Sequence, residues 1–151
     1  MDETQFQQTL ENVHDNPCPF AKAIFRGCCS CSRARKLLIA EREFFACISP
    51  GAQQRCATLL PELRKKAAFV LRSPHPGQGI LPHGKEIQIQ CGALLGIAMT
   101  LKNETTAPDN VADIFMLLES AERHYKDLEQ LPYAALMPVI AHFQNRPGRV
   151  R

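Results

Sequence analysis

Apolar side chains recur every three or four residues along most of the chain, the spacing that places them on one face of an α-helix. The clearest repeat lies in the C-terminal half, where it predicts a long helix that Asp109 caps and that ends near Glu129. A short amphipathic helix is also expected over residues 3–14. Residues 86–90 alternate like a strand, but they begin a longer run rich in Ala, Leu and Met. That composition favours a buried helix.

Prolines and glycines divide the rest of the pattern. Further helices are expected over residues 18–26, 33–48, 50–72 and 86–102, and a last one begins at Pro132. Ser49 and Pro50 form a helix start, since serine is a good N-cap and proline fits the first helical position. Pro61 and Pro138 lie inside predicted helices, where the missing N–H bends or divides a helix.

The expected fold is therefore all-α, a single-domain array or bundle of about six helices over residues 1–151. It comprises a thiol-rich half (1–72), a loop rich in proline and glycine (73–85), an apolar helical half (86–143) and a basic tail (144–151). Neither half alone is large enough for a substantial core, so the two are expected to share one.

Charge and hydropathy exclude some classes of protein. The net charge of +3 and the pI near 8.5 are too mild to predict a nucleic-acid partner. The most apolar run, residues 93–101, is much shorter than the roughly 20 residues of a membrane-spanning helix. The acidic, polar N-terminus lacks the features of a signal peptide. These features predict a cytoplasmic protein without a membrane span.

Cysteines are unevenly distributed. Six of the seven lie within one stretch: Cys18, Cys28, Cys29, Cys31, Cys47 and Cys56. The seventh, Cys91, lies in an apolar helix and is expected to pack in the core. A chain of this length buries roughly 70% of its unfolded surface and needs no disulfide staple. In a cytoplasmic protein, a cysteine cluster favours metal binding over disulfides.

The predicted ligand set takes one cysteine from each of four helix ends: Cys18, Cys31, Cys47 and Cys56. Tight connections between successive helices would allow these thiolates to meet in one pocket. Cys28 and Cys29 are alternatives to Cys31 within the same connector. Cys18 and Cys31 are expected to have lowered pKa values, because each would stand at the positive N-terminal end of a helix.

Four thiolates suit either zinc or an iron–sulfur cluster. An iron–sulfur cluster, such as a 4Fe–4S cluster, is favoured because the ligands come from separate elements, whereas structural zinc sites use closely spaced pairs. Nearby apolar residues would form its shell: Phe20, Ile24, Phe25, Phe44, Phe45 and Ile48. Zinc is the alternative cofactor.

The sequence thus predicts a small metalloprotein for electron transfer, redox sensing or support of a redox enzyme, acting with a protein partner. No catalytic set of residues stands out, so a carrier, sensor or adaptor is favoured over an enzyme. One alternative is a helical interaction module with structural zinc or purely structural cysteines. Another is a thiol-redox protein that uses the C-x-x-C pair Cys28 and Cys31.

Overall fold

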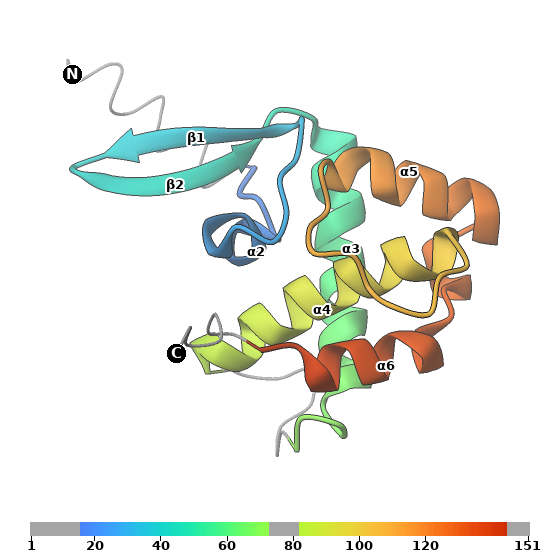
Figure 1. Cartoon of the computed structure of the whole chain (residues 1–151). Coiled ribbons are helices and arrows are strands. Elements are labelled where there is room, and N and C mark those ends of the chain that lie inside the picture. Colours follow the sequence, from blue (N-terminus) through green and yellow to red (C-terminus); the bar gives the residue numbers. More distant parts are fainter. Residues whose placement is uncertain (1–15, 73–81, 145–151) are drawn as a thin grey trace.

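A computed structural model of the protein describes residues 16–72 and 82–144. Over these ranges the chain is mostly helical, with five α-helices, one 3-10 helix and one two-stranded antiparallel sheet (Figure 1). The elements are α2 (Ala21–Arg26), β1 (Ala34–Ile39), β2 (Arg42–Cys47), α3 (Pro50–Ala67), α4 (His83–Leu101), α5 (Ile114–Tyr125), η1 (Leu128–Gln130) and α6 (Tyr133–His142). The helix expected over residues 3–14 lies outside the described residues.

Helix α4 forms the centre of the core. Almost every side chain from Glu86 to Ala98 is buried, which agrees with the apolar composition of this segment. Helix α6 lies along α4 (Figure 1), and a Cβ atom added to Gly92 would stand 2.6 Å from the Cα atom of Ile140. Glycine therefore permits the close approach of the two helices. Neither α4 nor any other helix of the described ranges is long and apolar enough to cross a membrane.

Helices α3 and α5 complete the core around α4. The largest side chains that they and α6 bury are Leu59, Leu60, Leu63, Ile114, Leu118, Leu136 and Ile140. Pro61 does not divide α3, which is continuous from Pro50 to Ala67 and ends before the expected residue 72. Ser49 caps α3 as expected, because its hydroxyl accepts the backbone N–H of Ala52 at 3.3 Å.

The helix expected over residues 33–48 is wrong: this segment is the β1–β2 hairpin. Its two-residue turn consists of Ala40 and Glu41, whose φ angles are +49° and +68°. Such paired positive φ angles belong to the tight turns that suit a hairpin. The outer edge of β2 also pairs with the segment before α2, since Cys18 N–H donates to Phe45 O at 3.1 Å. Tertiary pairing has overridden the local helical pattern.

Several helix boundaries also differ from expectation. Helix α4 begins at His83, within the predicted 73–85 loop, of which residues 73–81 lie outside the described ranges. Helix α5 starts after Asp113, not Asp109, because the Asp113 carboxylate accepts the N–H of Phe115 at 3.1 Å. With five α-helices and a hairpin in the described residues, the prediction of an all-helical bundle of about six helices holds only as a mostly helical fold.

Candidate functional site

A small cavity of about 20 Å³ lies among the base of the hairpin, the segment before α2, and the first turns of α3 and α5. All four predicted ligands line this thiol cavity: Cys18, Cys31, Cys47 and Cys56. The remaining lining residues are Pro19, Phe20, Arg33, Ala34, Ala52, Gln53, Arg55, Ile114 and Phe115. The structure therefore brings the four thiols together in a largely apolar setting.

The hairpin, not a helix, explains why Cys31 and Cys47 meet. Cys31 lies just before β1 and Cys47 is the last residue of β2, where it stands opposite Ala34. An antiparallel hairpin returns the chain to its starting point. A helix over residues 33–48 would instead hold its ends roughly 22 Å apart at 1.5 Å per residue. The predicted convergence is present, but for a different reason from the one expected.

Cys31 lies in the connector between α2 and β1. Hydrogen bonds to the segment before α5 hold this connector on both sides of Cys31. The Ser30 hydroxyl donates to Ala112 O at 2.6 Å, and its N–H donates to Val111 O at 3.0 Å. The Ser32 N–H donates to the Asp113 carboxylate at 2.9 Å. Asp113 thus caps α5 and holds the connector at once, which places Cys31 beside the N-terminal end of α5.

Burial is the main influence on these thiols. It raises the pKa of Cys18 and of Cys56 to about 12, and it also raises the pKa of Cys31. The nearby sulfurs raise these pKa values further, because a charge on one thiol disfavours a charge on the next. The prediction of lowered pKa values at Cys18 and Cys31 is wrong. Cys31 precedes a strand, and Cys18 lies before a helix of only six residues.

Backbone amides nevertheless face two of the sulfurs. Cys18 accepts a hydrogen bond from the N–H of Phe20, and Cys31 accepts from the N–H groups of Arg33 and Phe115. These bonds lower the pKa values of the two thiols, although burial outweighs them. Amide donors of this kind stabilise an anionic sulfur over a neutral one. In contrast, the Cys47 thiol donates to Ser49 O at 3.2 Å.

Two arginines line the thiol cavity and share one aromatic ring. The Arg33 guanidinium lies 4.1 Å from the centroid of the Phe115 ring, and the Arg55 guanidinium lies 5.3 Å from it. Arg55 also donates from Nη1 to the carboxylates of Glu119 and Glu122, at 2.9 and 2.8 Å. Both positive charges are therefore held at the wall of the cavity, on the side of α5.

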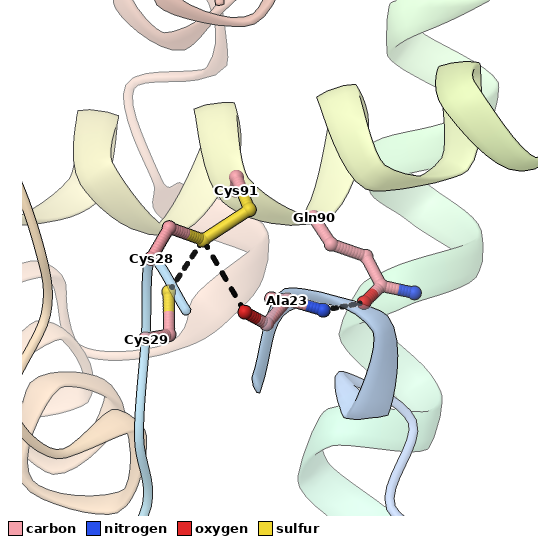
Figure 2. Close-up of a disulfide and its surroundings, with 5 residues drawn as sticks. All are labelled: Ala23, Cys28, Cys29, Gln90 and Cys91. Atoms are coloured by element: carbon pink, nitrogen blue, oxygen red, sulfur yellow. Dashed lines mark hydrogen bonds between the residues drawn. A yellow bond between two sulfur atoms is a disulfide. The ribbon is translucent and has the colours of Figure 1, made fainter. Parts of the chain in front are cut away.

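The other three cysteines form a separate group in the core. Cys28 and Cys91 are joined by a disulfide, and Cys29 Sγ lies 3.4 Å from Cys28 Sγ (Figure 2). None of the three lines the thiol cavity, so the alternatives Cys28 and Cys29 are placed away from the other candidate ligands. Cys91 is fully buried as expected, but it is covalently bonded and not simply packed. Cys28 is thus bonded to Cys91 and not to Cys31.

Some of the predicted shell lies elsewhere. Phe20 lines the thiol cavity, whereas Phe25 and Ile48 are largely exposed. Phe115 and Ile114 take their place from α5, a contact between distant parts of the chain that no local pattern signals. Arg55 was also missed. Its position next to Cys56 is the sequence signal that could have identified it.

The thiols are gathered but are not arranged as ligands. Among the residues that the structure describes, no group of three or more His, Cys, Asp or Glu side chains is arranged to hold a metal ion. A role for the cavity must therefore be argued from the chemistry of its lining. No protein-family model, curated protein or solved structure matches this chain.

Proposed function

We propose that the protein binds an iron–sulfur cluster through Cys18, Cys31, Cys47 and Cys56. Its role would be electron transfer, redox sensing or support of a redox enzyme, with a protein partner. One observation carries the proposal: four thiols from four separate segments line one cavity. Four thiolates in an apolar setting are a ligand set of iron–sulfur clusters and of zinc.

The surroundings of the cavity fit an anionic centre. A centre with four thiolates carries net negative charge, and Arg33 and Arg55 stand at the cavity wall. The amide donors to Cys18 and Cys31 would strengthen as these sulfurs become thiolates. The raised thiol pKa values describe the protein without a bound cation. Binding would displace the thiol protons, so loading should release protons and weaken at low pH.

The origin of the ligands favours a cluster over zinc. Structural zinc sites are usually built from closely spaced pairs of ligands. Here Cys18 precedes α2, Cys31 precedes β1, Cys47 ends β2 and Cys56 lies in α3. The aromatic and aliphatic lining would limit the access of solvent, which is one of the influences on the potential of a cluster.

Zinc is the second candidate, and the size of the cavity favours it. A volume of about 20 Å³ admits one body the size of a water molecule. A single ion would fit after small rotations of the four thiols, whereas a cluster would need the sulfurs to move outward. With zinc, the centre would be structural and the protein would be an interaction module.

Purification without oxygen tests the proposal. Broad visible absorbance near 400 nm, with iron and sulfide in comparable amounts, is expected for a cluster. Stoichiometric zinc in a colourless protein would support the second candidate. A colourless, metal-free protein that takes up neither after reconstitution would overturn both, and reversible dithiol chemistry in that protein would favour a thiol-redox function.

Single substitutions locate the site. Serine at position 18, 31, 47 or 56 should abolish or strongly weaken cluster binding. Cys29→Ser is the matched control, because Cys29 is a buried thiol with a pKa raised to about 12 that does not line the cavity. Loss of binding in Cys29→Ser alone would place the site elsewhere.

A further inference from the structure

Arg55 makes several hydrogen bonds, but one of its buried donors has no hydrogen-bond partner. Its side chain is only 12% exposed. Its Nη1 donates to Glu119 and Glu122, and its Nη2 donates to Phe115 O at 3.2 Å. Nε is the one buried side-chain nitrogen or oxygen of the described residues that lacks a hydrogen-bond partner. An unsatisfied buried donor destabilises the folded protein, so such a group calls for an explanation.

The position of Arg55 suggests where the missing acceptor belongs. Arg55 lines the thiol cavity, and with Ala52 and Phe115 it also lines a wide open groove of about 860 Å³. The carboxylates that Arg55 contacts, Glu119 and Glu122, belong to the groove and not to the cavity. Nε is screened from solvent, and the side chains on the cavity side that carry an acceptor are those of the four cysteines and Gln53. Neutral thiols are weak acceptors, whereas thiolates are strong ones.

We infer that Arg55 is a positioning residue that donates its Nε–H to a thiolate of the centre bound in the thiol cavity. This inference rests on the proposed function. Cys56, the next residue in the chain, lines the same cavity and is the nearest candidate acceptor by sequence. Glu119 and Glu122 offset the charge of Arg55, so its particular contribution is the directed hydrogen bond.

The first test observes the donor directly and needs no variant. The Nε–H resonance of Arg55 is assigned by ¹⁵N NMR in the metal-free protein, and zinc alone is then added. Zinc is diamagnetic and leaves the signal visible. On stoichiometric uptake, the Nε–H proton should shift downfield and exchange more slowly with solvent. The Arg64 Nε–H, which donates to Glu86 and does not line the thiol cavity, serves as the internal reference.

The second test separates the hydrogen bond from the charge. Arg55→Lys keeps the positive charge but loses the Nε–H, whereas Arg55→Gln loses both. Zinc affinity should fall about tenfold or more in both variants, as is typical when a supporting hydrogen bond to a ligand is removed. In the iron–sulfur form, both variants should have a more negative midpoint potential than the unmodified protein. Circular dichroism checks that each variant is folded.

Arg42→Lys is the matched control. Arg42 also lies over an aromatic ring, 5.8 Å from the centroid of Phe44, but it does not line the thiol cavity. Lysine at position 42 should therefore leave the potential almost unchanged. If Arg55→Lys behaves like the unmodified protein, or if the Arg55 Nε–H does not respond to bound zinc, the inference is wrong while the proposed function stands. If the protein binds the cluster but not zinc, the midpoint potentials of the two Arg55 variants test the inference instead. If neither binds, both proposals fail.

Discussion

Cys47 lies directly across the hairpin from Ala34, and this pairing returns the chain to the cavity that it left at Cys31. The thiol cavity depends on that return, because two of its four sulfurs are carried by the ends of the hairpin. The hairpin is therefore part of the site and not an appendage to the helical core.

The turn of the hairpin is predicted to limit the stability of the protein. Ala40 and Glu41 both have positive φ angles, which cost energy for residues with a side chain. Ala40→Asn combined with Glu41→Gly supplies the residue pair that such turns favour. The double variant should raise the free energy of unfolding by about 1 kcal/mol, measured by urea denaturation. Ala40→Pro, which cannot adopt positive φ, should instead destabilise the hairpin and weaken metal binding. A neutral Ala40→Pro variant would contradict the observed turn.

The Cys28–Cys91 disulfide is predicted to be a major source of stability. The two residues are 63 positions apart, and closing a loop of that length stabilises a protein by up to about 4 kcal/mol in the chain-entropy treatment. Unfolding by urea with and without a reductant should show a loss of this order. Cys29→Ser should respond to the reductant as the unmodified protein does. Equal stability in both redox states would argue against the disulfide.

A buried carboxylate is predicted to make stability depend on acid pH. Burial raises the pKa of Glu86, but hydrogen bonds from Arg64 and Gln90 and the charges of Arg64 and Lys22 together hold it below its ordinary value of 4.5. A lowered pKa in the folded state stabilises the fold above pH 4.5, and this contribution is lost as the pH falls through the folded-state pKa. Urea unfolding between pH 6 and pH 3 should show this loss.

Glu86→Gln is the corresponding variant. It should remove that part of the acid sensitivity and cost about 2 kcal/mol at neutral pH, because the bonds from Arg64, at 2.7 and 3.0 Å, lose their charged acceptor. Lys36 and Glu43 form an exposed ion pair at 3.1 Å, so Glu43→Gln is a suitable control with little expected effect. If the free energy of unfolding of Glu86→Gln fell between pH 6 and pH 3 as much as that of the unmodified protein, Glu86 would not be the source of the acid sensitivity.

The contact between α4 and α6 is predicted to be intolerant of a methyl group. Gly92→Ala should destabilise the protein by roughly 1–3 kcal/mol, since the new Cβ would meet the backbone of Ile140. Gly51, in the first turn of α3, has open space around it. Gly51→Ala should be neutral or slightly stabilising in the same thermal-unfolding experiment. Similar effects at the two positions would show that helix propensity, not packing, decides the outcome.

Sequence periodicity was informative where one face of a helix meets the core. The helices at positions 50, 83, 114 and 133 were expected within a few residues of their observed starts. The hairpin was missed because Leu37 and Leu38, like Phe44 and Phe45, are adjacent apolar pairs that suit either structure. Its turn also lacks the Asn and Gly residues that usually signal one.

The candidate site was only partly predictable. The set of four cysteines followed from their number and spread, but their surroundings depend on contacts between distant segments. Phe115 and Arg55 meet across about sixty residues of sequence, and a spacing rule cannot reveal such contacts. Likewise, seven cysteines allow many pairings, and the chain alone does not indicate that Cys28 bonds to Cys91.

The connector between α2 and β1 joins the two groups of sulfur atoms. Cys28 ties its start to α4, and Ser30 and Ser32 hold its middle and end against the segment before α5. Folding alone therefore restricts the backbone of Cys31. If Cys31 is a ligand as proposed, it would lose less conformational entropy on loading, which would raise affinity without any additional contact to the bound centre.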